Sequence, residues 1–213
     1  MENTPKLYII AGPNGIGKTS TALNQIPKNS PIINADEITK QLKETFSHIN
    51  VQELAQDETT KQINFHLSQK SSFGFETNLA DLETWKFIES VQFLGYQIIV
   101  TFYCVDDIKL CVDRVENRVK QGGHFVRPDI IKARYDNALK LLSHYKDIPD
   151  LLLLVDNSIQ PYVCSILQKG QINERNESLP EWVKSLIDKE EQPISDDSLD
   201  AVRARYNKMR KGD

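Results

Sequence analysis

Apolar positions along the chain fall into two patterns, short continuous runs and longer stretches with helical spacing. The runs are rich in β-branched and aromatic residues and predict buried strands over residues 7–11, 31–34, 73–76, 97–104 and 151–155. The stretches with helical spacing predict helices over residues 19–25, 38–46, 54–67, 82–94, 108–119 and 130–145. Because parallel strands need long connections, this alternation predicts an α/β fold, a mostly parallel five-stranded sheet with helices on both faces.

The composition of the chain changes after Gly170. Residues 171–213 are mostly polar, and two segments within them, 180–187 and 199–210, have the spacing of short amphipathic helices. We expect a helical C-terminal tail that packs on the core through the apolar residues Leu179, Trp182, Val183 and Leu186. The pattern thus predicts one domain over residues 1–170 and a helical extension over residues 171–213.

Overall composition narrows the classes of protein and partner. The 213 residues carry a net charge of −4, with 39% hydrophobic and 26% charged residues, as in an ordinary soluble globular protein. The acidic balance gives no general attraction to nucleic acid or anionic lipid, and no apolar run is long enough to cross a bilayer. Three cysteines without CxxC spacing predict neither a disulfide framework nor a zinc site. We expect a cytoplasmic protein with no nucleic-acid or membrane partner.

One motif points to nucleotide chemistry. The residues that follow the first predicted strand fit the pattern GxxxxGK[ST], with Ser20 adjoining them: Gly12, Pro13, Asn14, Gly15, Ile16, Gly17, Lys18 and Thr19. Such a loop turns successive backbone N–H groups inward at a helix N-terminus and so cradles phosphate. Lys18 would reach the β- and γ-phosphates, and the Thr19 hydroxyl would bind Mg²⁺. The motif predicts a P-loop nucleoside triphosphate hydrolase or kinase fold that binds a nucleoside triphosphate with magnesium.

Three acidic residues follow predicted strands and could serve this site. Asp106 and Asp156 stand where a Walker B carboxylate would hold Mg²⁺ through water. Asp36 ends the second predicted strand, so it would lie beside the γ-phosphate and could orient or deprotonate an acceptor hydroxyl. The structural alternative is that Asp36 caps the helix predicted over residues 38–46, and the neighbouring Glu37 could share either role.

Polar side chains also end the third predicted strand. Glu76, Thr77 and Asn78 bring a carboxylate and two hydrogen-bonding groups to the same edge of the sheet. Next to Asp36 and the phosphate loop, they favour a pocket for a polyhydroxylated acceptor. Alone, the same residues would be equally consistent with a turn before the next helix.

A cluster of basic residues predicts a mobile cationic lid. Arg114 and Arg118 are four residues apart on one helix face, Gly122-Gly123 then break the helix, and Arg134 follows. A phosphotransferase uses such a lid to exclude water and to stabilise charge on the moving phosphoryl group. The alternative is a salt-bridged surface helix with a flexible loop, in which His124 is a loop residue.

These motifs together resemble the zeta-toxin family of P-loop kinases, and most closely its short bacterial branch. The resemblance covers roughly residues 6–158 and consists of five blocks in order: AGPNGIGKTS, NADE, FETNL, RVENRVKQGGHFVRPDIIKARYDNALKLL and LLLLVDNS. The phosphate loop is common to many families, whereas the order of all five blocks is more specific.

The resemblance implies phosphoryl transfer from ATP to the 3′-hydroxyl of the sugar in UDP-N-acetylglucosamine. It implies that Lys18 and Thr19 hold phosphates and magnesium, and that Asp36 is the general base. Glu76 and Thr77 would bind the amino sugar, with Asn78 beside them, and either Arg118 or Arg134 would bind the transferring phosphate. The family's toxins are often neutralised by a small antitoxin that blocks the nucleotide site.

Two other functions remain open from the sequence. The chain could be a kinase for another small acceptor, such as a nucleoside, a sugar or a coenzyme precursor. It could also be a regulatory ATPase, in which bound nucleotide controls a partner. The first would release ADP with a different acceptor, and the second would hydrolyse ATP slowly without any acceptor.

Overall fold

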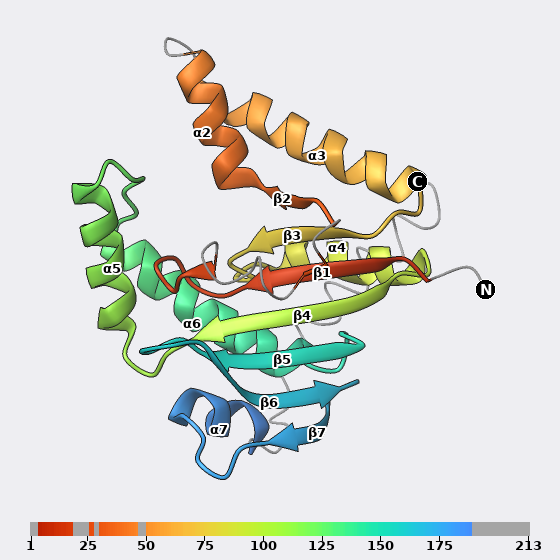
Figure 1. Cartoon of the computed structure of the whole chain (residues 1–213), viewed down its shortest axis with the longest axis vertical. Helices are drawn as coiled ribbons and strands as arrows, with labels where there is room; N and C mark the ends of the chain where they lie inside the picture. Colours follow the sequence, from red (N-terminus) through yellow and green to blue (C-terminus); the bar gives the residue numbers. More distant parts are fainter. Residues whose placement is uncertain (1–3, 19–25, 28–29, 47–49, 189–213) are drawn as a thin grey trace, which may run out of the picture.

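The structure is a computed structural model that describes residues 4–18, 26–27, 30–46 and 50–188. Its centre is a seven-stranded sheet in the order β2-β3-β1-β4-β5-β6-β7 (Figure 1). The strands are β1 (Lys6–Ala11), β2 (Ile32–Asn34), β3 (Phe73–Thr77), β4 (Gln97–Cys104), β5 (Leu151–Asp156), β6 (Tyr162–Gln168) and β7 (Gln171–Arg175). The helices are α2 (Ala35–Thr45), α3 (Gln52–Ser68), α4 (Leu82–Phe93), α5 (Ile108–Lys120), α6 (Pro128–Tyr145) and α7 (Glu181–Ile187).

The predicted α/β class is confirmed, and the five predicted strands pair in parallel as β2-β3-β1-β4-β5. The predicted count of five strands is wrong, because β6 and β7 add an antiparallel hairpin beyond β5. The helix predicted over residues 19–25 and the segment 199–210 lie outside the described residues.

The polarity of β7 explains why the hydrophobic pattern does not predict this strand; β6 is more apolar and partly buried, and the predicted elements nevertheless do not include it. All five residues of β7 are exposed, so this edge strand has no apolar face. The two residues between the strands, Lys169 and Gly170, have φ values of 49° and 75°, which is the conformation of a tight two-residue hairpin turn. The hairpin spans position 170, where the sequence predicts a domain boundary, and that boundary stays a prediction.

The sheet separates two hydrophobic clusters. On one face, α4, α6 and α7 bury apolar side chains against β1, β3, β4 and β5, with Trp85, Phe73 and Phe102 among the largest. The smaller cluster on the other face includes Cys111 and Val115 of α5, packed with Tyr103 of β4. Burial on both faces accounts for the continuous apolar runs of the parallel strands. All three cysteines are buried with free thiols.

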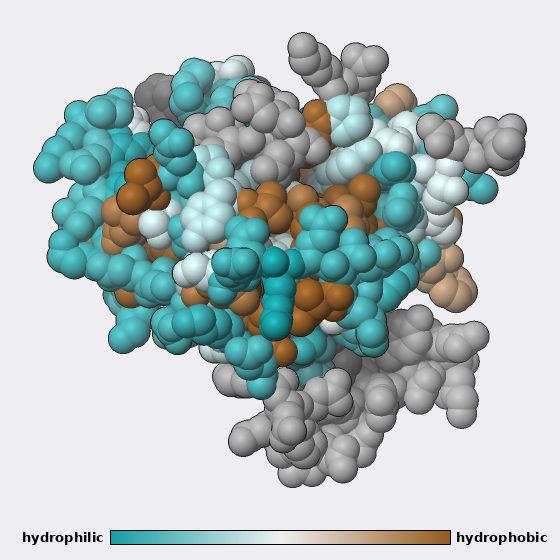
Figure 2. Space-filling view, turned by 60° about the horizontal axis from the view of Figure 1, so that its bottom comes forward, coloured by the Kyte–Doolittle hydropathy of each residue, from teal (hydrophilic) through white to brown (hydrophobic). Residues whose placement is uncertain are grey.

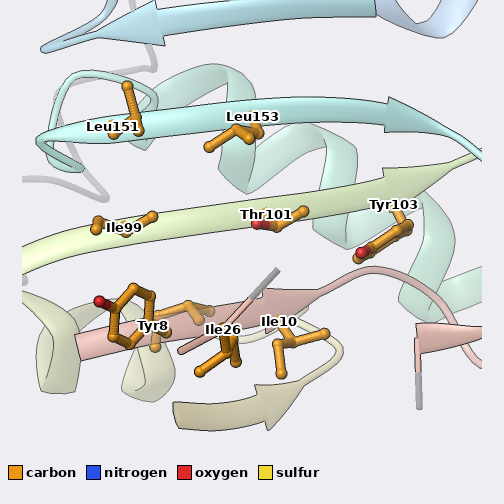
Figure 3. Close-up of a pocket in the computed structure, with 9 residues that line it drawn as sticks. Tyr8, Ile10, Ile26, Ile99, Thr101, Tyr103, Leu151 and Leu153 are labelled. Atoms are coloured by element: carbon orange, nitrogen blue, oxygen red, sulfur yellow. The ribbon is translucent and has the colours of Figure 1, made fainter. Parts of the chain in front are cut away.

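A cavity of about 210 Å³ opens on the second face, against the middle of the sheet. Figure 3 shows that side chains of β1, β4 and β5 line this cavity, together with Ile26, which lies outside these strands. The lining contains no charged side chain, so chemistry that needs charges must be sought at the strand ends. On the face of the molecule shown in Figure 2, hydrophobic residues gather near the centre and hydrophilic residues surround them. Among the described helices, none has the length and apolar character of a membrane span.

The C-terminal helix α7 is anchored on the core by apolar and polar contacts. Trp182, Val183 and Leu186 are buried and Leu179 packs against the same cluster, as the sequence predicts. The carboxylate of Asp106 accepts hydrogen bonds from the backbone N–H groups of Glu181 (3.1 Å) and Trp182 (2.8 Å). Because N–H groups in the first turn of a helix have no partner within the helix, Asp106 caps α7 from a distant part of the chain.

We expect Asp106→Ala to lower the free energy of unfolding by about 1–2 kcal/mol, because two N–H groups of α7 would lose their acceptor. Urea unfolding followed by tryptophan fluorescence measures the change. The matched control is Asp113→Ala, which removes only a surface ion pair with Lys109 and should change stability by less than about 0.5 kcal/mol. Equal midpoints for the Asp106 variant and the wild type would contradict the capping role.

Candidate functional site

The candidate site lies at the carboxyl ends of three neighbouring parallel strands. β1 runs into the phosphate loop after Ala11, which is paired in register with Thr77 of β3. Glu76 of β3 is paired in turn with Asn34, the last residue of β2. Ligands of open α/β sheets bind at such carboxyl ends, and the register therefore gathers the predicted phosphate and acceptor residues along one edge.

The phosphate loop has a backbone that only glycine accommodates at two points. Gly12 has a φ of 135°, and a Cβ added there would overlap the carbonyl oxygen of Tyr103 in β4. Gly15 has a φ of 80°, and a Cβ there would overlap the carbonyl oxygen of Cys111 in α5. The loop is thus held against β4 and α5 with its backbone in the open conformation that phosphate oxygens require. This geometry fits a bound nucleoside triphosphate.

Lys18 connects the loop to the end of β3. Its side chain is buried, and its ammonium group donates hydrogen bonds to the carbonyl oxygens of Gly12 (2.7 Å) and Pro13 (3.1 Å). A third hydrogen bond reaches Oδ1 of Asn78 at 3.3 Å. The lysine and the asparagine, 60 residues apart in sequence, thereby meet at the carboxyl edge of the sheet.

Burial and neighbouring charges act in opposite directions on Lys18. Burial is the largest of the effects that together lower the pKa of the Lys18 ammonium to about 8. The positive charge of Arg118 also lowers this pKa, and the negative charges of Glu76 and Asp36 offset part of the decrease. The structure therefore brings these three predicted site residues within electrostatic range of Lys18.

Asp36 lies in the first turn of α2 and is exposed. The helix begins at Ala35, three residues before its predicted start, and its cap is Asn34. Asn34 Oδ1 accepts hydrogen bonds from the backbone N–H groups of Asp36 (2.9 Å) and Glu37 (3.2 Å). The structural alternative for Asp36 as the cap is thus wrong, because Asn34 fills that position.

The three polar residues that end β3 have different surroundings. Glu76 accepts a hydrogen bond from the side-chain amide of Asn34 at 2.7 Å. The Thr77 hydroxyl accepts one from the backbone N–H of Leu79 (3.1 Å), a buried residue with a φ of 57°. A leucine in the left-handed region is strained, and this strained turn follows directly after Asn78, whose side chain meets Lys18.

The predicted lid arginines occupy separate positions. Arg134 of α6 donates a hydrogen bond to Oδ1 of Asn14 in the phosphate loop at 2.8 Å. Arg118, near the end of α5, is exposed and donates to the carbonyl oxygen of His124 at 2.9 Å. Arg114 donates to the carbonyl oxygens of Asn157 and Ser158, after β5. Of the three, only Arg134 has a described hydrogen bond to the phosphate loop.

The two Walker B candidates are engaged in holding α7. Both oxygens of Asp106 accept hydrogen bonds from its first turn, as described above. Asp156 is buried and accepts hydrogen bonds from the indole N–H of Trp182 (3.4 Å) and the backbone N–H of Ser158 (2.9 Å). The predicted metal ligand Thr19 and its neighbour Ser20 lie outside the described residues.

Two residues near the site were not predicted from the sequence. Asn34 links the α2 cap to Glu76, and an asparagine immediately before a helix is a recognisable capping signal. Asn157 is buried and donates a hydrogen bond to the carbonyl oxygen of Ile16 at 2.6 Å, which fixes the phosphate loop to the end of β5. That contact spans 141 residues and leaves no local signal in the sequence.

Comparison with known proteins gives one sequence relative and several structural neighbours. No family model matches the chain. An uncharacterised protein of Haemophilus influenzae is 27% identical over 138 residues, which are 63% of this chain and 94% of that protein.

The structural neighbours share the fold at low sequence identity. A candidate kinase from Chloroflexus aurantiacus is 21% identical, with a TM-score of 0.52 over 74% of this chain and 90% of its own. A chain of the AvrRxo1-ORF1:ORF2 complex with ATP is 13% identical, with a TM-score of 0.66 over 91% of this chain and 67% of its own. A chain of the PezAT toxin-antitoxin system of Streptococcus pneumoniae is 14% identical, with a TM-score of 0.57 over 97% of this chain and 88% of its own. The chain therefore shares its α/β fold with these proteins.

Proposed function

We propose that this protein is an ATP-dependent kinase that phosphorylates a hydroxyl group of a small acceptor. The observation that carries the proposal is the position of Lys18, between the phosphate loop and the polar ends of β2 and β3. A P-loop lysine at that place would bridge a bound triphosphate and an acceptor beside it. A structural neighbour crystallised with ATP and another described as a candidate kinase support the same chemistry.

For the acceptor, we propose a UDP-sugar, with UDP-N-acetylglucosamine as the first candidate. The proposal rests on the sequence resemblance to zeta toxins and on the polar groups of Glu76, Thr77 and Asn78, which suit sugar hydroxyls. By the same argument, we propose a small antitoxin protein as a partner, a role supported by the neighbour from a toxin-antitoxin system.

In the proposed mechanism, ATP would supply the γ-phosphoryl group. Thr19 would be the residue that holds Mg²⁺, and the cation would neutralise part of the phosphate charge. Lys18 neutralises negative charge that spreads over the phosphoryl oxygens. Asp36 accepts the proton of the acceptor hydroxyl, while Glu76 orients the acceptor. An arginine of the lid, Arg118 or Arg134, completes the positive surroundings and helps to exclude water.

The first experiment measures ADP release from MgATP with and without UDP-N-acetylglucosamine, followed by phosphorus NMR of the product. We expect Asp36→Asn to lower kcat by about 10²–10⁴-fold with ATP affinity retained, because it removes only the proton acceptor. Lys18→Ala, which should abolish turnover, is the control for the phosphate loop. A loss of ATP binding in the Asp36 variant would instead identify this residue as part of the nucleotide site, and acceptor-independent hydrolysis would contradict the kinase.

The lowered pKa of Lys18 predicts a pH dependence of nucleotide affinity. A bound triphosphate raises the pKa of this ammonium above its value of about 8 in the unliganded protein, so binding must take up a proton once the pH exceeds that value. We therefore expect the Kd for ATP to be constant below pH 8 and to rise by up to about tenfold per pH unit above it. Isothermal titration calorimetry measures the Kd for ATP between about pH 7 and 9.5, a range chosen because it brackets the Lys18 pKa of about 8. Lys18→Arg, which keeps its charge, should show weaker but pH-independent binding; an equal slope would contradict the assignment.

Replacing each of the two candidate lid arginines should have a different effect on ATP binding and on kcat. Arg134 contacts the phosphate loop, so Arg134→Ala should weaken ATP binding and turnover together. Arg118 is exposed and bonded to its own loop, so Arg118→Ala should lower kcat by about 10²-fold and leave the Kd for ATP unchanged if it acts only when the lid closes. Lys132→Ala, on the exposed face of α6, is the control. Unchanged kcat in the Arg118 variant would assign the lid role to Arg134 alone.

A further inference from the structure

Asn34 holds two carboxylate-bearing segments of the candidate site at once. It is the last residue of β2 and the N-cap of α2, so its side chain lies where the strand passes into the helix. Its amide nitrogen donates to Oε2 of Glu76 at 2.7 Å. Its amide oxygen accepts from the backbone N–H groups of Asp36 at 2.9 Å and Glu37 at 3.2 Å. One side chain thus links the end of β3 to the turn that carries Asp36.

The chemistry of this double link suits asparagine better than the other capping residues. A serine can cap a helix, but its hydroxyl is too short to also reach a carboxylate on the next strand. An aspartate can cap as well, but it has no donor for Glu76 and would place a second negative charge beside it. The amide supplies a donor and an acceptor on the two sides of one rigid group, so both contacts are kept together.

The carboxylate that Asn34 binds, that of Glu76, and the carboxylate of Asp36, whose backbone N–H donates to Asn34, are the charges that act most strongly on Lys18. Glu76 has the largest effect among those that raise the Lys18 pKa, and Asp36 has the next. Their positions relative to the ammonium group therefore matter to the charge of the phosphate loop. In-register pairing of Asn34 with Glu76 fixes the backbone on one side, and the α2 cap fixes it on the other.

We propose that Asn34 is a positioning residue that sets the separation between the Asp36 base and the acceptor-binding carboxylate of Glu76. This inference rests on the proposed kinase function. Asn34 itself does not contact the phosphate loop in any described hydrogen bond; it acts through the carboxylate that it holds. Loss of the amide donor removes a contact that holds the Glu76 side chain at the sheet edge. We therefore expect acceptor binding to weaken more than nucleotide binding.

The test compares variants that separate the two contacts. Asn34→Ser keeps the helix cap and loses the bond to Glu76, so we expect kcat/KM for the acceptor to fall about 10- to 100-fold. The Kd for ATP should stay unchanged, and the unfolding midpoint should fall slightly while the protein stays folded. Glu76→Ala removes the acceptor of this bond and should itself weaken acceptor binding; in that background Asn34→Ser should add little further loss, because the bond that it removes is already absent. The proposal would be overturned if the kcat/KM losses of the two single variants multiplied in the double variant. It would also be overturned if the activity fell only in proportion to the amount of folded protein.

Asn34→Asp provides a readout that a purely structural cap would not change. It keeps the cap but sets a carboxylate against Glu76, and one proton of that pair is then held to higher pH. We expect the acidic limb of the kcat/KM profile to move to higher pH relative to the wild type, whereas Asn34→Ser should leave that limb in place. Identical profiles for the Asn34→Asp variant and the wild type would contradict the contact with Glu76.

Failure of the kinase function itself is distinguishable. If the wild-type protein transfers phosphate to none of the acceptors tried, the proposed function fails, and the link is measured by urea unfolding of the Asn34→Ser, Glu76→Ala and double variants. A smaller effect of Asn34→Ser on the free energy of unfolding in the Glu76→Ala background would preserve the link between the two residues. Equal effects in both backgrounds would show that the link does not exist and would overturn the inference.

Discussion

The buried ammonium group of Lys18 is the charge around which the carboxyl edge of the sheet is organised. A buried cation is costly unless hydrogen-bond acceptors surround it, and here two carbonyl oxygens of its own loop and the amide oxygen of Asn78 do so. The amide oxygen of Asn78 is within reach because β1 and β3 are parallel neighbours that end together. Strand order thus determines which side chains the lysine meets, and the glycines of the loop allow it to turn back on its own carbonyls.

The carboxylates of this edge divide into two groups with different roles. Asp36 and Glu76, beyond β2 and in β3, act on the charge of Lys18. Asp106 and Asp156, at the ends of β4 and β5, bind α7 through its first turn and through the indole of Trp182. In a parallel sheet all four residues lie at strand ends, and the sequence favours Asp36 among them, with Asp106 and Asp156 as Walker B candidates. The antiparallel hairpin β6–β7 gives these last two another role, because the chain returns from it directly to α7, and α7 then engages the ends of β4 and β5.

The sequence predicts those features of the fold and the site whose signal lies within a short segment of the chain. The parallel strands are continuous apolar runs, and their bounds agree with the prediction to within about a residue or two, because burial on both faces dictates their composition. The phosphate loop is an eight-residue signal and is equally clear. The apolar pattern does not predict the edge strand β7, because an exposed strand needs no apolar residues. The sequence does not single out Asn34 as the cap, because Asp36 and Glu37 are both acidic residues suited to a helix start; the backbone shows that the helix begins before them.

The energetic cost of burying the Lys18 charge explains why several neighbouring groups interact with it. With its pKa lowered from 10.5 to about 8, Lys18 binds a proton less firmly in the folded state than in the unfolded one. Its contribution therefore opposes folding at neutral pH, and that cost diminishes only as the pH rises from about 8 toward 10.5. The native protein keeps the charge because the carboxylates of Glu76 and Asp36 offset part of the burial. A bound phosphate would offset it further, so the remaining cost of the buried cation is relieved by the ligand. Such a site binds anions strongly because its positive group is already stripped of water and held in place. Asn34 holds the Glu76 carboxylate and the backbone of the turn that carries Asp36, so it helps to keep both charges near the lysine.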